Sequence, residues 1–357
     1  MSALFESGYF HRHPAWHKEG MVTSRPPRDW QEFRVWSGLT WDPVEVPLFT
    51  DDGLDFETGQ PKYRGLRTHK AVFRSDRMDA EEPLAVVTST YEVINHQAMG
   101  EIAQAVLADR EVEMDAGGSL DGGKTVWVLF KLGDPIQIGG DTSLTLPYAA
   151  FINSHDGTGA LKALSTSVRV VCMNTVNASI GEASRNGTVA TIYHTTNWKD
   201  RVEEIRLALA GARADHDTYV EWAEALTGFS VTDDDFDTFA KLWFWPKDMT
   251  AQITDRVRAN IQDAENTFRA MYQSVTCDGI RGNAYGVMQA MGEYLDHGRG
   301  FQTKDDDVRR DRHTQRTLMR PEPLKRKAAI VLGDVISQKL VHGRTVKNAN
   351  TGELLAL

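Results

Sequence analysis

A stripe of mostly apolar residues in the second half of the chain recurs at alternating intervals of three and four positions. Its members are Val202, Ile205, Leu209, Ala212, His216, Tyr219, Ala223 and Leu226. This spacing places them on one face of a helix that packs along another helix. Asn197 is a candidate N-cap and Gly228 a candidate stop for this long helix. The stripe therefore predicts that the chain from residue 197 onward is mainly helical.

The preceding part of the chain, residues 62–196, has the pattern of an antiparallel sheet. Short β-branched and aromatic runs alternate with glycine-rich turns, and one helix is expected at His96–Ala108. Residues 1–61 are rich in proline, tryptophan and turn residues, which predicts an arm with short strands. The expected fold class is α+β: an antiparallel sheet with a packed helix, followed by a helical domain with a long heptad-patterned helix. The corresponding domains are 1–61, 62–196 and 197–357.

The segment Gly118–Thr125 matches the phosphate-loop pattern GxxxxGK[ST]. That pattern binds phosphate only where a strand precedes it and a helix follows. The residues that follow here, Thr125–Leu132, are β-branched and aromatic and predict a strand. We therefore interpret the segment as the turn of a β-hairpin, and ATP hydrolysis is not expected.

Two clusters of polar residues end apolar runs between residues 148 and 177. The first is Asn153-Ser154-His155-Asp156-Gly157, and the second includes Arg169, Cys172, Asn174 and Thr175. The first cluster has the composition of a tight turn whose side chains cap their own backbone. His155 is also suited to contact a phosphate or to act as an acid or base. Cys172 is either a small buried residue or a nucleophile.

The formal net charge is −10, from 40 Lys and Arg against 50 Asp and Glu. This excludes a protein that is basic all over, but it leaves room for a local basic groove. The densest basic run comprises Arg309, Arg310, Arg312, Arg316, Arg320, Lys325, Arg326 and Lys327. This run fits contact with phosphates, although a solvated or subunit-contacting segment remains an equal alternative.

Other sequence features limit the class of protein. No apolar run is long enough for a membrane helix, and residues 1–20 lack the apolar core of a signal peptide. Two cysteines in 357 residues favour a reducing cytoplasm over a disulfide framework. The histidines His11, His13 and His17 lack further ligands nearby in sequence, so we interpret them as surface or packing residues. No metal and no cofactor are expected.

Five ordered motifs carry a resemblance to a known family. They are His11-x-His-Pro-Ala-Trp-His17, Gly117-Gly-Ser-Leu-Asp-Gly-Gly-Lys124, Asn153-Ser-His-Asp-Gly157, Arg169-Val-Val-Cys-Met-Asn-Thr175 and Tyr193-His-Thr195. In this order they resemble the phage- and plasmid-borne proteins grouped as domain of unknown function 932, a family that implies no reaction. More distantly, the β-rich half is similar to phage single-strand annealing proteins of the recombination-mediator superfamily. That similarity implies a small sheet with a helix, assembly into rings or filaments, and binding of single-stranded DNA by its backbone.

The first hypothesis is a non-enzymatic phage or plasmid protein that binds single-stranded DNA and anneals strands in recombination or replication. It would act as a homo-oligomer in the cytoplasm of a bacterial host, without a membrane. The expected contacts are Lys162, Arg169, His155 and Asn174 from the sheet and Arg309, Arg310, Arg312 and Arg316 from the tail. One alternative is an enzyme on nucleotides or nucleic acid in which His155, Asp156, Cys172 and His194 converge. Another is an acidic interaction protein that acts on a host factor.

Overall fold

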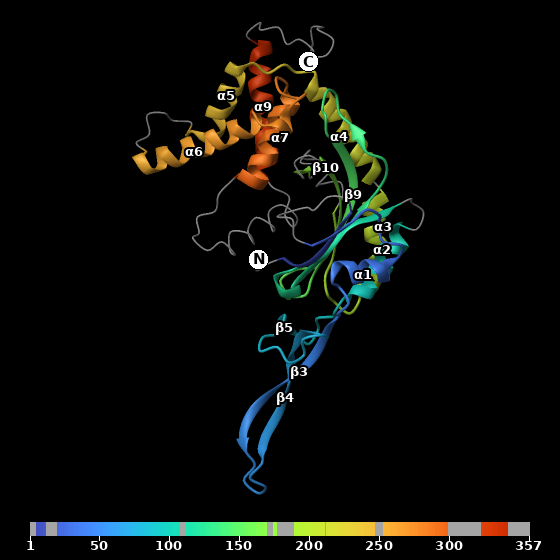
Figure 1. The fold of residues 1–357 in the computed structure, drawn as a ribbon. Helices are drawn as coiled ribbons and strands as arrows, with labels where there is room; N and C mark the ends of the chain where they lie inside the picture. The colour runs from blue at the N-terminus through green and yellow to red at the C-terminus, as the bar shows by residue number, and fades with distance from the viewer. Residues whose placement is uncertain are drawn as a thin grey trace. The chain divides into compact units, whose positions relative to one another are not determined.

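The computed structural model describes residues 5–11, 20–107, 112–169, 174–176, 189–210, 212–246, 253–298 and 323–341. The chain divides into two compact units. Unit 1 comprises residues 1–132, 148–165 and 187–211, and unit 2 comprises residues 133–147, 166–186 and 212–357. Helices and mainly antiparallel strands occur together, which confirms the α+β class (Figure 1).

The strands are β1 (Phe5–His11), β2 (Met21–Thr23), β3 (Pro43–Leu54), β4 (Pro61–Arg74), β5 (Ala85–Thr88), β6 (Glu113–Leu120), β7 (Thr125–Lys131), β8 (Ile136–Gln137), β9 (Leu144–Ser154), β10 (Leu161–Arg169), β11 (Asn174–Val176) and β12 (Val189–Ile192). The α-helices are α1 (Trp30–Ser37), α2 (His96–Leu107), α3 (Val202–Ala210), α4 (Ala212–Thr227), α5 (Asp233–Phe244), α6 (Asp255–Tyr272), α7 (Ala284–Glu293) and α9 (Pro323–Val341). Short helical turns η1 (Asp121–Gly123), η2 (Trp198–Arg201), η3 (Val275–Cys277) and η4 (Tyr294–Gly298) connect them.

Unit 1 is built on a sheet with the strand order β2-β1-β6-β7-β9-β10-β12. The β1–β2 pair is parallel, whereas β1–β6, β6–β7, β7–β9 and β10–β12 are antiparallel. The segment Gly118–Thr125 forms the turn between β6 and β7, which confirms the predicted hairpin. Because a strand follows this turn, no helix N-terminus faces it, and the phosphate-loop pattern is coincidental here.

Helices α1, α2 and α3 cover one face of this sheet (Figure 1). Each helix presents apolar side chains to the strands, as expected for an amphipathic helix on a sheet. The resulting core contains Trp30 and Phe33 from α1, Ile102 from α2, Leu209 from α3 and Val128 from β7. Helix α2 confirms the helix predicted at residues 96–108.

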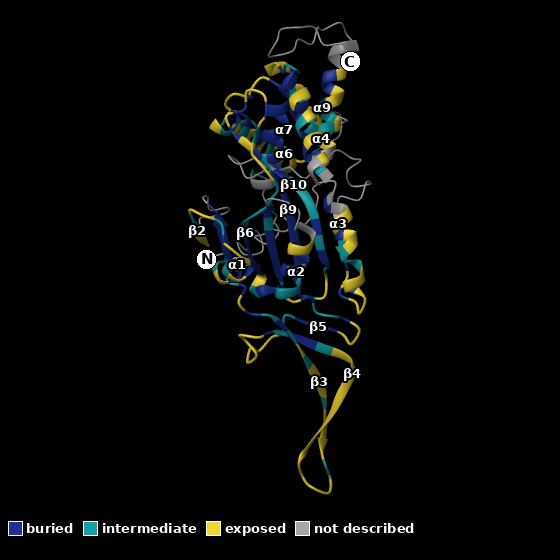
Figure 2. Ribbon diagram, turned by 90° about the vertical axis from the view of Figure 1, so that its right-hand side faces the viewer, coloured by how far each residue is buried: buried dark blue, intermediate teal, exposed yellow. Residues whose placement is uncertain are grey.

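Strands β3 and β4 form an antiparallel arm whose outer part is exposed (Figure 2). Strand β5 pairs only with His69–Val72 at the inner end of β4. The outer stretch, Leu48–Leu54 with Pro61–Leu66, is therefore a ribbon of two strands. A two-stranded ribbon without a third strand or a packed helix has little independent stability in water. The inner end of the arm carries the buried side chains, among them Val72, while the outer residues of β4 are exposed.

Unit 2 is mainly helical, with its own core formed by α4, α5, α6, α7 and α9. Helix α7 is buried throughout and its residue Tyr285 is fully enclosed. Thr232 caps α5 through a capping box with Asp235. The heptad stripe falls on α3 and α4, which flank Gly211, a residue outside the described ranges. Whether these two helices form the single long helix predicted from the stripe stays untested.

Candidate functional site

Three histidines from distant segments of unit 1 meet in a buried cluster. His96 begins α2, His155 follows β9 and His194 follows β12. The Nε2 atoms of His96 and His155 lie 3.2 Å apart, and the ring centroids of His155 and His194 lie 6.5 Å apart. Trp41 contacts the rings of His96 and His155 edge-on, and Tyr91 stacks on His194 with 4.6 Å between centroids. We call His96, His155 and His194 the histidine cluster.

The hydrogen bonds of the cluster assign the protons on its rings. A backbone carbonyl only accepts, so Nδ1 of His96 donates to Leu39 O and Nδ1 of His194 donates to Glu92 O. Nε2 of neutral His96 must then accept, and the proton between the rings belongs to Nε2 of His155. Nδ1 of His155 and Nε2 of His194 are left as bare acceptors, with no hydrogen-bond partner among the described residues.

Burial lowers the pKa of every member of the cluster. The pKa of His96 falls to about 4 because burial penalises the imidazolium, and that of His155 falls well below its ordinary value for the same reason. Burial also lowers the pKa of His194. Near neutral pH the rings are therefore uncharged. His155 has no exposed surface, so its ring offers neither charge nor access to a phosphate in solvent. His155 is therefore not one of the DNA contacts that we propose.

The structure brings together only part of the residue set that the enzyme hypothesis requires. His155 and His194 are neighbours, as that hypothesis requires. Asp156 instead accepts from the backbone and the hydroxyl of Thr158 and from the hydroxyl of Ser154, so its carboxylate fixes its own turn. This is the capping role that the turn composition favoured. Cys172 lies outside the described residues.

The other predicted DNA contacts lie on several different elements. Lys162 lies on β10 in unit 1, opposite Thr191 of β12, and is half-buried. Arg169 and Asn174 lie opposite each other where β10 and β11 pair in unit 2. The tail residues Arg309, Arg310, Arg312 and Arg316 lie outside the described ranges.

Strand β4 is rich in basic residues. It carries five basic residues and no acidic one: Lys62, Arg64, Arg67, Lys70 and Arg74. At about 3.4 Å per residue they extend over about 40 Å of strand. Within the described chain, neither Lys62 nor Arg67 has an ion-pair partner, while Arg64 pairs with Asp52 at the surface. Such exposed pairs contribute little free energy and are readily exchanged for another anion.

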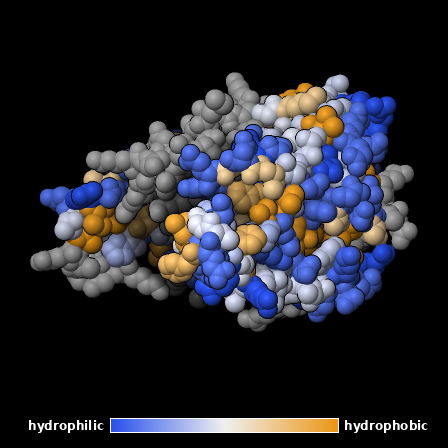
Figure 3. All heavy atoms as spheres, turned by 90° about the horizontal axis from the view of Figure 1, so that it is seen from below, coloured by the Kyte–Doolittle hydropathy of each residue, from blue (hydrophilic) through white to orange (hydrophobic). Residues whose placement is uncertain are grey.

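The ribbon formed by β3 and β4 also exposes aromatic rings. Phe49 is 62% exposed, Tyr63 is 64% exposed and Phe56 at the tip is fully exposed. In the register of β3 with β4, Phe49 faces Gly65 and Asp51 faces Tyr63, so Phe49 and Tyr63 share one face of the ribbon with Asp51. Lys62 and Arg64 alternate with Tyr63 and therefore lie on the other face. Seen from below, hydrophobic side chains gather in small patches among hydrophilic ones (Figure 3). The outer arm thus combines exposed aromatic rings with cations on β4 and carboxylates on β3.

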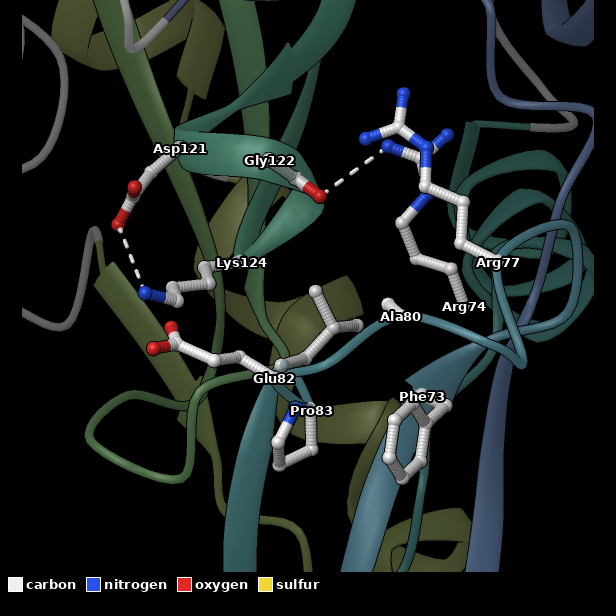
Figure 4. Close-up of a pocket in the computed structure, with 10 residues that line it drawn as sticks. Phe73, Arg74, Arg77, Ala80, Glu82, Pro83, Asp121, Gly122 and Lys124 are labelled. Atoms are coloured by element: carbon white, nitrogen blue, oxygen red, sulfur yellow. Dashed lines mark hydrogen bonds and ion pairs between the residues drawn. The ribbon is translucent and has the colours of Figure 1, made fainter.

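A cavity of about 220 Å³ lies at the base of the arm (Figure 4). Arg74, Arg77 and Lys124 line it, but their charges are compensated. Arg74 donates to both oxygens of Asp76, to Glu6 and to the carbonyl of Gly122, and its guanidinium lies over the ring of Trp41.

Arg77 also pairs with Glu6, and Lys124 pairs with Asp121. The hydrogen bonds from Arg74 lower the pKa of Asp76, so this carboxylate stays ionised and keeps Arg74 engaged. The ion pairs of Arg74 and Arg77 with Glu6 thus join the base of the arm to β1. The cations of β4 that have no ion-pair partner among the described residues, Lys62 and Arg67, lie farther out on the strand.

Sequence reasoning missed both the arm and His96. The absence of any acidic residue from Pro61 to Arg74 is a signal that a local charge count would have found. No comparable signal marks His96, since a single histidine at the start of a helix reveals nothing about its distant neighbours.

The comparisons with known proteins identify one family. A family model described as "Domain of unknown function (DUF932)" matches residues 83–319. The histidine cluster lies inside the matched range, whereas the arm precedes it. No curated protein and no solved structure matches the chain. None of the described helices has both the length and the apolar character needed to cross a bilayer.

Proposed function

The chain belongs to the DUF932 family, and we propose that this member binds single-stranded DNA along strand β4 of its arm. One observation carries the proposal: strand β4 has five basic residues and no acidic residue, and the ribbon that it forms with β3 exposes Phe49 and Tyr63. Cations neutralise the phosphates of a strand, and flat rings stack on its unpaired bases.

Exposed rings favour a single strand over a duplex. Bases inside a duplex are already stacked and paired, so their faces are unavailable to Phe49 and Tyr63. Stacking tolerates any base because each has a π-face, and the arm offers few groups that would read base edges. We therefore expect binding with little sequence preference and strong salt dependence.

The acidic total charge does not oppose this function. The overall charge of −10 is a sum over the whole chain, whereas a DNA strand at the arm meets charge within about a Debye length, roughly 8 Å at physiological salt. Within that distance, the cations of β4 lie beside Asp51 and Asp52 of the paired strand β3. We therefore expect Lys62 and Arg67, which have no ion-pair partner among the described residues, to meet the phosphates. Strand annealing, a phage or plasmid origin and assembly into a homo-oligomer remain parts of the same proposal.

Fluorescence anisotropy with a labelled oligothymidylate tests the proposal across a series of salt concentrations. The double variant K62A/R67A removes two cations without partners among the described residues. We expect weaker binding and a smaller slope of log K against log salt, by about 1.4 for two lost phosphate contacts.

The matched control is K199A/R206A, which removes the same charge from exposed positions in η2 and α3 of unit 1. It should retain wild-type binding. Equal loss in both double variants would reduce the effect to net charge, and an absence of binding by the wild type at low salt would end the proposal.

A further inference from the structure

A group of potential metal ligands lies in the sheet of unit 1 where β1 pairs with β6. His11 ends the described part of β1, and Glu113 and Asp115 begin β6. One ligand atom from each of these three side chains lies within 4.8 Å of the other two. Nδ1 of His11 is 3.2 Å from Oδ1 of Asp115. Residues more than a hundred positions apart therefore place one nitrogen and two carboxylate oxygens together.

The group is partly removed from solvent, and its negative charge is incompletely balanced. The side chain of His11 is 3% exposed and that of Asp115 is 19% exposed. Oε2 of Glu113 is shielded from solvent and accepts no hydrogen bond from the described residues; its nearest cation there is Lys131, with Nζ at 3.6 Å. Two carboxylates thus face one lysine, and bringing like charges together in a poorly solvated place is unfavourable without a further cation.

Two features of the surrounding sheet orient the aspartate. The hydroxyl of Tyr148 donates to Oδ2 of Asp115 at 2.6 Å, which leaves Oδ1 directed toward His11. Such a bond to a ligating carboxylate is typical of the groups that support metal ligands. The β6–β7 register also shifts between Met114 and Ala116, so that Asp115 sits in a bulge. Bulges occur often beside functional sites, where they redirect a side chain.

From these contacts we propose that His11, Glu113 and Asp115 bind a divalent transition-metal ion, for which Zn²⁺ is the probe. One imidazole with two carboxylates suits zinc or manganese better than the all-oxygen sites of calcium or the thiolate sites of copper(I). A tetrahedral ion with bonds of about 2.0–2.2 Å holds its ligand atoms roughly 3.3–3.6 Å apart. The His11–Asp115 pair already has about this separation, and the Glu113 side chain, 43% exposed, has room to approach.

Three protein ligands leave a fourth position of a tetrahedral ion for water or another molecule. The proposal sets aside the expectation, drawn from the sequence, that no metal is bound. It does not depend on DNA binding by the arm, since neither region shares a residue with the other.

Isothermal titration calorimetry of the full chain, first stripped with a chelator and then titrated with Zn²⁺, tests this site. We expect one zinc site. Its affinity for zinc should fall at least tenfold in E113Q and in D115N, because loss of a residue that only supports a metal ligand already weakens metal binding by about 10–100-fold. The control E101Q replaces an exposed carboxylate on α2 and should bind zinc as the wild type does. Because Asp115 also accepts from Tyr148, E113Q alone decides the result if D115N fails to fold.

Two outcomes would overturn the proposal. The first is wild-type zinc affinity in E113Q, which would place any bound zinc elsewhere. The second is release of zinc by excess Mg²⁺, since a site containing imidazole should retain the transition metal.

Discussion

The arm and the histidine cluster contain similar side chains in opposite environments. On the arm, Phe49 and Tyr63 are more than half exposed, whereas Trp41 beside the cluster is 2% exposed. The rings of the arm are exposed and available to a partner. The ring of Trp41 instead packs against Arg74 and His96. The difference teaches that residue type sets what a side chain is able to do and that burial decides which of these roles it performs.

The two regions also differ in how they relate to the family. The cluster lies within the range matched by the family model, and the arm lies before it. The cluster joins α2, the end of β9 and the segment after β12, and the amide of His155 donates to Lys124 O in the β6–β7 turn. It therefore connects several elements of unit 1. We infer that the cluster maintains the fold and that the arm carries the contact with DNA.

The largest expected effect follows from deleting one ring in each region. Trp41→Ala removes a ring that packs between the guanidinium of Arg74 and the ring of His96, so unit 1 should lose about 3–5 kcal/mol of unfolding free energy. Phe49→Ala, at an exposed position, should change it by less than about 0.5 kcal/mol. Urea unfolding followed by circular dichroism measures both. Equal losses would show that the outer arm is packed in solution.

The second prediction concerns acid. The pKa of His96 is lowered to about 4 from 6.5, so the unfolded chain binds more protons between these values. The stabilisation is complete above pH 6.5 and is lost as the pH falls toward 4, with a magnitude on the order of 3 kcal/mol.

Unfolding free energies measured across this range test the prediction. The variant His96→Gln should flatten the pH dependence, whereas His69→Gln, at an exposed position on the arm, should leave it as in the wild type. An unchanged pH profile in His96→Gln would assign the acid sensitivity to other groups.

A smaller effect is expected from one aromatic ring of the arm. Tyr63→Ala should weaken binding of the labelled oligothymidylate by about 1–3 kcal/mol, because one stacked base loses its ring. Tyr63→Phe keeps the ring and should bind as the wild type does. Anisotropy measures both, and equal weakening in the two variants would point to the hydroxyl instead of stacking.

The smallest effect on stability is expected at the surface ion pair of the arm. Arg64→Ala breaks the pair with Asp52 and should change the unfolding free energy by about 1 kcal/mol or less. Its affinity for the oligonucleotide should nevertheless fall, since one phosphate partner is lost. A loss of stability without a loss of DNA affinity would contradict the proposed DNA contact and would show that Arg64 has a structural role.

The local parts of the fold were predictable because each depends on neighbours in sequence. The hairpin turn at Gly118–Thr125 follows from glycines before a β-branched run, and the start of α5 follows from Thr232 before three aspartates. The helix at His96–Leu107 follows from its spacing of apolar residues. In each case the stabilising contacts lie within a few residues.

The candidate sites were not predictable in the same way. His155 was noted among the polar residues of a predicted turn, but its partner His96 is 59 positions away. His11 was interpreted as a packing residue because no ligand stood near it in sequence, and Asp115 reaches it across 104 positions. Nothing in a local pattern brings such pairs together.

The sequence by itself determined the α+β class, the mainly helical second half, the hairpin turn and the helix cap, because hydrophobic period and turn chemistry act over short stretches of chain. Only the tertiary structure decided that the three histidines are neutral and buried, that the outer arm is exposed, and that His11 meets two carboxylates. These properties depend on which strands pair and which surfaces lose water, and both are set by contacts between residues far apart in the chain.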